Sequence, residues 1–293
     1  MRWSSKPKIE KDKIAKLAKD LSVDTTIAEI LLQRNIATFE AAKKFFRPSL
    51  DDLHDPFLMK DMDKAVERIE TAISNHENIL VFGDYDVDGT SAVSLVASYL
   101  KTIYPNISTY IPDRYEEGYG VSFKGIDFAE DNNFSLIIAL DCGTKALEKV
   151  TYASEKKIDF IICDHHKPGP ELPKAVAILN PKRADCHYPF DELCGCGVGF
   201  KLIQALGKNR QQSIEDLVPY LDLVATAIAA DIVPMNGENR TLAYFGLQVI
   251  NTNPRNGIKA IIHQTKKEVL TITDVVFIVA PRINAAGRMK HGN

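Results

Sequence analysis

From Asn78 onward, short apolar segments alternate with longer amphipathic ones, and each apolar segment stops at a polar or glycine-containing turn. Apolar runs of four to eight residues are typical of strands that are buried on both faces. Such strands belong to parallel sheets covered by helices. The predicted strands are Ile79–Phe82, Ile107–Ile111, Leu136–Leu140, Asp159–Cys163 and Val176–Leu179. The chain is therefore predicted to be an α/β protein with a mainly parallel sheet and helices on both faces.

Helical periodicity occupies much of the remaining sequence. Residues 1–60 are predicted to form a helical N-terminal extension, ahead of an α/β domain at 61–293. Within that domain, apolar residues recur at helical spacing in Met62–Ser74, Thr90–Leu100, Lys145–Lys156, Val198–Leu206, Pro219–Asp231, Thr241–Ile250 and Asn256–Gln264.

Composition excludes several classes of protein. The 293 residues include 36 Lys and Arg, 39 Asp and Glu and 45% hydrophobic residues, with a net charge of −3. This balance excludes an intrinsically disordered chain and a polybasic nucleic-acid coat. No apolar run approaches the ~20 residues that span a bilayer. The charged N-terminus has no signal-peptide core, and five cysteines form no disulfide framework, so we expect a cytoplasmic protein without membrane association.

Acidic and imidazole side chains follow three of the predicted strands. Since ligands of open parallel sheets bind at the carboxyl ends of the strands, these side chains are expected to meet in one crevice. Clustered carboxylates repel one another and need a cation between them, and an oxygen-rich set with one or two histidines suits Mn²⁺ or Mg²⁺. The residues concerned are Asp84, Asp86 and Asp88 after the first strand, Asp141 after the third, and Asp164, His165 and His166 after the fourth.

The residues suggest two other metal sites. The segment from Asp84 to Gly89 copies the opening of an EF-hand calcium loop, but Leu95 stands where that loop needs a bidentate Glu. The group Cys186, His187, Cys194 and Cys196 lacks the Cys-x-x-Cys spacing of common zinc sites. Neither alternative is favoured.

Several segments in order resemble the motifs of the DHH phosphoesterase family. They are GDYDVDG at 83–89, the strand-ending Asp141, DHH at 164–166 and ATAIAADIVPM at 225–235. Three further segments resemble the RecJ group within that family, which are single-strand-specific 5′→3′ DNA exonucleases: IPDRYEEGYG at 111–120, LCGCGVGFKL at 193–202 and RINAAGRM at 282–289. The resemblance covers residues 60–293.

The resemblance implies a site that holds two Mn²⁺ or Mg²⁺ ions and hydrolyses phosphodiesters. The implied ligands are Asp86, Asp88, Asp141, His165 and Asp231, with Asp141 bridging and Asp84 either a further ligand or an anchor. Asp164 is expected to orient a histidine ring, and His166 to meet the scissile phosphate or to protonate the leaving oxygen.

Substrate contacts are expected from Arg114, Arg282, Asn284 and Arg288, because arginines bind phosphate in bidentate fashion. The glycines Gly195, Gly197 and Gly199 open a helix whose N–H groups hold a phosphate, or else they only permit close packing.

Three functions remain open at this point. The first is a 5′→3′ exonuclease on single-stranded DNA, a monomer that works in DNA repair and recombination beside a single-strand-binding protein and a helicase. The second is a DHH phosphodiesterase acting on short oligonucleotides or cyclic dinucleotides, and the third is a catalytically weak DNA-binding scaffold. RecJ-like proteins continue into DHH-associated and OB-like domains, so the chain is expected to hold the catalytic half.

Overall fold

The computed structural model describes residues 6–265 and 267–289, and side chains as far as Gly287. It divides into two compact units, Met1–Leu53 and His54–Asn293. The first unit contains α1 (Lys11–Leu21), α2 (Thr25–Leu32), α3 (Phe39–Phe46) and the 3₁₀ turn η1 (Leu50–Asp52). Their apolar faces meet in a small core built around Leu17, Ala28, Leu31 and Ala42.

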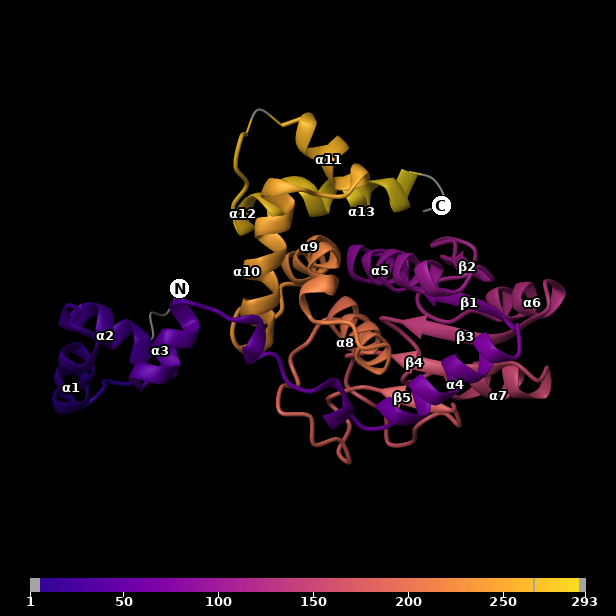
Figure 1. Cartoon of the computed structure of the whole chain (residues 1–293), viewed down its shortest axis with the longest axis horizontal. Coiled ribbons are helices and arrows are strands. Elements are labelled where there is room, and N and C mark those ends of the chain that lie inside the picture. Colours follow the sequence, from indigo (N-terminus) through magenta and orange to yellow (C-terminus); the bar gives the residue numbers. More distant parts are fainter. Residues whose placement is uncertain (1–5, 266, 290–293) are drawn as a thin grey trace. The chain divides into compact units, whose positions relative to one another are not determined.

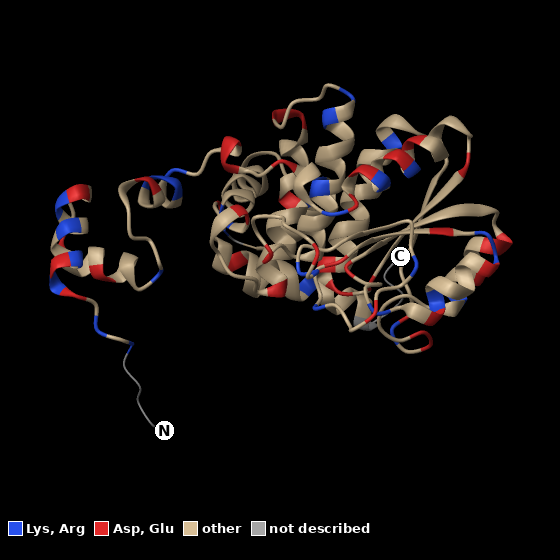
Figure 2. Cartoon of the chain, turned by 90° about the horizontal axis from the view of Figure 1, so that it is seen from below, with Lys and Arg blue, Asp and Glu red and all other residues tan. Residues whose placement is uncertain are grey.

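The second unit contains a five-stranded sheet in which every pair of neighbours is parallel. The order β2-β1-β3-β4-β5 runs from top to bottom in Figure 1. The strands are β1 (Asn78–Gly83), β2 (Ile107–Tyr110), β3 (Phe134–Leu140), β4 (Asp159–Cys163) and β5 (Ala177–Leu179). Figure 2 shows the sheet almost free of charged residues, as burial on both faces requires.

Helices cover both faces of this sheet. On one face, α6 (Phe123–Asp131) and α7 (Leu147–Glu155) bury Ile126 and Val150 against strand residues such as Phe82 and Ile162. On the other face, α5 (Val87–Ile103) contacts β1 and β3, and α8 (Gly195–Asn209) contacts β3 and β4. α4 (Met62–Ser74), which follows the 3₁₀ turn η2 (Pro56–Leu58), contacts β5 and α8. The predicted α/β class is confirmed.

The C-terminal part is helical and packs beyond α5 and α8. The 3₁₀ segment η3 (Glu215–Tyr220) leads into α9 (Leu221–Asp231), which contacts α5, α8 and α10 (Gly237–Thr252). The buried carboxylate of Asp222 at the start of α9 accepts hydrogen bonds from the backbone and guanidinium of Arg255. The remaining elements are α11 (Asn256–His263), α12 (Ile272–Asp274), the π-helical turn η4 (Val275–Val279) and α13 (Ala280–Met289).

Within the described residues, no helix combines the length and apolarity needed to cross a bilayer.

Candidate metal centre

The first acidic segment lies between β1 and α5. Asp86 caps α5, since its carboxylate accepts the N–H of Gly89 at 3.0 Å. Asp88 falls in the first turn of that helix and is buried. Asp84 is also buried, and one carboxylate oxygen accepts the N–H of Gly120 at 3.2 Å. A Cβ on Gly89 would lie 2.5 Å from the carbonyl oxygen of Asp84, so the close approach of these two backbone segments requires glycine.

Asp141 stands at the end of β3 in the left-handed backbone region, with φ of 58°. Its side chain is buried, and its Oδ1 has no hydrogen-bond partner among the described residues. The same oxygen lies 3.2 Å from Nε2 of His165 and 3.9 Å from Nδ1 of His166. An anionic oxygen that is buried without a donor is costly unless a cation satisfies it.

His165 joins this oxygen to two further carboxylates. Its Nε2 is 3.8 Å from Oδ2 of Asp88 and 3.7 Å from Oδ2 of Asp231, the last residue of α9. Two triplets therefore lie within metal-binding reach, and they share His165: Asp141, His165 and His166 form one, and Asp88, His165 and Asp231 form the other.

Asp164 belongs to neither triplet but holds the histidine loop. It accepts N–H groups from Thr144, His165 and His166, and its Oδ1 lies 2.8 Å from Nδ1 of the His166 ring. Burial alone would raise the pKa of Asp164, but the hydrogen bond and charge of His166 outweigh it and lower this pKa to about 2. Asp164 is thus an anionic anchor, and the ring it orients is that of His166.

The carboxylates nearer His165 show the opposite shift. Burial, together with the charge of Asp231, raises the pKa of Asp88 to about 7. Burial and the charge of Asp88 raise the pKa of Asp141 well above its usual value. Burial lowers the pKa of His165 to about 4, which keeps a neutral imidazole available as a ligand. Repelling carboxylates beside a neutral imidazole form an oxygen-rich donor set that Mn²⁺ or Mg²⁺ would fit.

The glycine-rich start of α8 completes the centre. The N–H groups of Gly195 and Cys196 each donate to the Asp88 carboxylate at 2.7 Å, and the N–H of Gly197 donates to Sγ of Cys194 at 3.3 Å. A Cβ on Gly199 would lie 3.2 Å from Val96 and 3.5 Å from Leu140. The packing alternative therefore holds for these glycines, and their phosphate-holding role is wrong because these donors are already engaged within the chain.

The residues predicted to contact the substrate lie farther apart than the predicted metal ligands do. The guanidinium of Arg114 stacks 4.8 Å above the centre of the Tyr85 ring. Arg282 is exposed and donates to the carbonyl of Ile278, and Asn284 lies one half-turn further along α13. The backbone of this helix approaches the acidic segment, since a Cβ on Gly287 would lie 3.1 Å from the carbonyl oxygen of Tyr85. The side chain of Arg288 lies outside the described residues.

Three residues at the centre escaped the sequence prediction. The Tyr119 hydroxyl lies 3.3 Å from Nε2 of His166, and its ring stands edge-on to both His166 and Tyr85. Fully buried Asn180 donates to the Thr144 hydroxyl and to the His166 carbonyl, which fixes the loop from behind. Tyr119 lies in a segment that resembles the family, which was the available signal, whereas nothing in the sequence marked Thr144 or Asn180.

The cysteine group that suggested zinc does not form a metal site. No cysteine is among the side chains that gather within metal-binding reach in residues 6–265 and 267–289. Cys194 caps α8, and Cys186 accepts the N–H of Lys60 at 3.5 Å.

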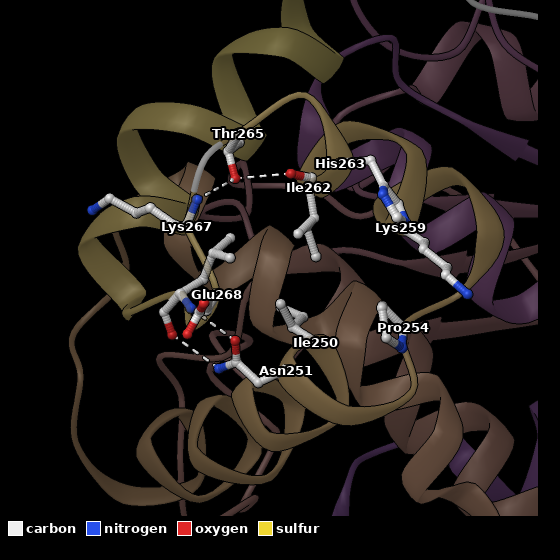
Figure 3. Close-up of a pocket in the computed structure, with 10 residues that line it drawn as sticks. Ile250, Asn251, Pro254, Lys259, Ile262, His263, Thr265, Lys267 and Glu268 are labelled. Carbon is white, nitrogen blue, oxygen red and sulfur yellow. Dashed lines mark hydrogen bonds between the residues drawn. The ribbon is translucent and has the colours of Figure 1, made fainter.

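Figure 3 shows another hollow, bounded by α10, α11 and the segment before α12. Its polar groups hold that segment in place: Asn251 exchanges hydrogen bonds with Leu270, and Thr265 donates to the carbonyl of Ile262. Lys267 pairs with Asp274. None of the residues of the two ligand triplets lines this hollow, so it is not the candidate centre.

The chain is thus an α/β protein with a parallel sheet, and a candidate metal site lies at the carboxyl ends of its strands. Within that class, the sequence model of the DHH family, N-terminal domain, matches residues 78–228, just over half of the chain. The chain belongs to the DHH family.

Curated relatives narrow the resemblance. The single-stranded-DNA-specific exonuclease RecJ of Bacillus subtilis (strain 168) is 38% identical over 295 residues, which cover 100% of this chain and 37% of the relative. RecJ of Escherichia coli (strain K12) is 36% identical over 244 residues, which cover 79% of this chain and 42% of the relative. The chain thus spans less than half of either relative.

Solved structures of RecJ proteins also match the chain. A crystal structure of exonuclease RecJ bound to manganese matches with a TM-score of 0.74 and 28% identity, over 83% of this chain and 60% of that one. RecJ of Thermus thermophilus in complex with Mn²⁺ matches with a TM-score of 0.80 and 24% identity, over 96% of this chain and 40% of that one, which shows the shared fold.

Proposed function

We propose that this chain is the catalytic part of a metal-dependent exonuclease that hydrolyses single-stranded DNA from the 5′ end. The observation that carries the proposal is the buried Oδ1 of Asp141, which has no hydrogen-bond partner among the described residues and belongs to one of two ligand triplets that share His165. The names of the relatives, single-stranded-DNA-specific exonucleases at 36% and 38% identity, support the substrate class.

In the proposed site, Asp86, Asp88, Asp141, His165 and Asp231 hold two Mn²⁺ or Mg²⁺ ions. When bound, such ions acidify a water molecule and neutralise charge on the phosphoryl oxygens. Asp84, whose free oxygen is buried without a partner among the described residues, anchors the first acidic segment through Gly120.

His166 is the proposed proton carrier. Asp164 fixes its ring through Nδ1, which leaves Nε2 directed toward the Tyr119 hydroxyl and the open side of the centre. A ring held in this way can donate a proton to the leaving oxygen without searching other rotamers. Asp164 therefore acts as a positioning residue for His166.

The proposed DNA contacts use Arg114 beside the first acidic segment, and Arg282, Asn284 and Arg288 along α13. The stacking of Arg114 on Tyr85 holds its guanidinium at the rim of the centre. The approach of α13 to the Tyr85 carbonyl brings that helix to the same rim. A guanidinium placed as that of Arg114 is suits the phosphates of a passing strand.

By the same resemblance we infer a cytoplasmic monomer that acts in DNA repair and recombination, and that meets single-stranded DNA prepared by a helicase and covered by a single-strand-binding protein.

A length series of single-stranded oligonucleotides, labelled at either end, tests the function. Release of mononucleotides from the 5′ end of long strands in Mn²⁺, and its loss in excess chelator, is the expected result. Cleavage confined to dinucleotides or cyclic dinucleotides would support the short-substrate phosphodiesterase instead. DNA binding without cleavage in either metal would support the scaffold.

A further inference from the structure

A second hollow adjoins the metal centre, and His166 and Asp164 form the wall between them. The hollow is bounded by residues 119–121, by residues 142–146 after β3, and by the first turn of α7. Val121 and Cys142 in its lining belong to the apolar cluster under α6 and α7. The hollow therefore lies on that face of the sheet. The carboxylates of Asp88 on α5 and Asp231 on α9 lie on the other side of His166.

Two lysines give the hollow a positive charge. Lys145 and Lys149 both line it, and neither forms a salt bridge with a carboxylate in the part of the chain that the structure describes. The ammonium of Lys149 lies 5.6 Å from the centre of the Phe123 ring. The one acidic group in the lining, Asp164, is already engaged by three backbone N–H groups and the His166 ring. An anion entering the hollow would meet two available ammonium groups.

The rest of the lining is largely apolar. The Tyr119 ring, 55% exposed, stands at one side, and Val121 and Ala146 lie deeper. Gly120 and Gly143 both have positive φ, 83° and 110°, which favours glycine and leaves the backbone bare of side chains there. A planar ring can lie against such a surface, and an aromatic side chain at its edge offers a stacking partner.

We propose that this hollow binds one nucleoside monophosphate unit, with its phosphate on Lys145 and Lys149 and its base against Tyr119. The inference rests on the proposed function, because the unit is the nucleotide that flanks the bond being cut. An occupant of the hollow touches the wall formed by His166, and so lies next to a phosphodiester held at the carboxylates. The cluster of carboxylates repels a polyanion, and the lysines supply the opposite charge on the other side of that wall.

The test measures binding of thymidine monophosphate, thymidine and inorganic phosphate to the whole chain by calorimetry. Excess chelator is present, so no divalent ion holds the phosphate at the carboxylates and no hydrolysis occurs. Lys145→Gln/Lys149→Gln removes both charges, and Lys145→Arg/Lys149→Arg keeps them. Lys101→Gln is the matched control, since Lys101 is exposed and lies about 20 Å along α5 from Asp88.

The expected result is that thymidine monophosphate binds at least about tenfold more tightly than thymidine or phosphate alone. The double Gln variant loses this advantage, whereas the double Arg variant and Lys101→Gln retain it. Equal affinity of the double Gln variant and the unaltered chain, or equal affinity for thymidine and its monophosphate, overturns the inference. If phosphate alone binds as tightly as the nucleotide, the contact with the base is refuted.

The binding test of the hollow and the cleavage test of the proposed function can fail independently. Lysine-dependent nucleotide binding in a chain that cleaves no DNA would reject the exonuclease and leave the hollow as a nucleotide site. Cleavage of DNA without lysine-dependent binding would reject the hollow alone.

Discussion

The carboxylate of Asp88 accepts the backbone N–H groups of Gly195 and Cys196, each at 2.7 Å. These bonds join the first turn of α5 to the first turn of α8. Asp88 and Gly195, which are 107 positions apart in the sequence, therefore fix each other's position. Gly195 can approach so closely only because it has no side chain: a Cβ there would lie 2.5 Å from Oδ1 of Asp141. The metal centre thus depends on a residue that offers no ligand atom.

Gly195→Ala tests this dependence. The added methyl group must displace either Asp141 or the start of α8, so Mn²⁺ affinity is expected to fall by about 10- to 100-fold. Gly257→Ala is the matched control, because a Cβ on Gly257 meets nothing within 4 Å. Calorimetric titration with Mn²⁺ measures both. Unchanged affinity in Gly195→Ala would show that the contact does not shape the site.

Asp141→Asn is expected to reduce hydrolysis of single-stranded DNA by at least about 100-fold, since a neutral amide replaces a charged ligand of the proposed metal centre. Asn tolerates the left-handed backbone that this position requires, so the fold is kept. Asp131→Asn, at the exposed end of α6, is the control. The measurement is the rate at which each variant hydrolyses a labelled single-stranded oligonucleotide in Mn²⁺. Near-normal turnover by folded Asp141→Asn would contradict the proposed placement of the catalytic centre.

A buried ion pair between α8 and α10 gives a prediction about stability. Lys201 and Glu238 lie 2.5 Å apart with almost no exposure, and Glu238 also accepts the hydroxyl of Tyr188 and the N–H of His54. Lys201→Met leaves a buried carboxylate without its cation and is expected to lower the free energy of unfolding by about 3–5 kcal/mol. Adding Glu238→Gln to that variant is expected to recover part of the loss.

The control lies on the same helix. Lys208 pairs with Asp55 at the surface, where side-chain exposures of 56% and 44% predict that Lys208→Met costs no more than about 1 kcal/mol. Urea unfolding compares the variants. Equal losses for Lys201→Met and Lys208→Met would refute the distinction between the buried and the exposed pair.

Ile232, directly after Asp231, ends α9 with φ of 57° and ψ of 35°, a left-handed conformation that is strained for a β-branched residue. Its side chain is 80% exposed, so little packing compensates. Ile232→Gly is expected to raise the free energy of unfolding by about 0.5–1 kcal/mol. Ile232→Ala keeps the Cβ and is expected to give a smaller gain. A loss of stability in the glycine variant would mean that the exposed side chain makes a contact worth more than the strain.

The sheet could be predicted because its strands are apolar runs with sharp ends. The helix α6 could not, since its apolar face is short and Gly125 interrupts the pattern. The expected start of α5 is Thr90, but the helix begins at Val87, because Asp86 caps it and so carries Asp88 into the helix. The carboxylates could be predicted as ligands because they follow the ends of strands, whereas the role of Gly195 depends on a contact between distant segments. No local pattern records such a contact.

Anomalous diffraction from crystals of the chain soaked in Mn²⁺ tests the central claim most directly. The account predicts anomalous peaks among Asp88, Asp141, His165 and Asp231, where two ligand triplets share one imidazole. It also predicts that these peaks disappear in Asp141→Asn. Well-ordered crystals with no peak at these side chains, or with Mn²⁺ bound only elsewhere on the chain, would contradict it.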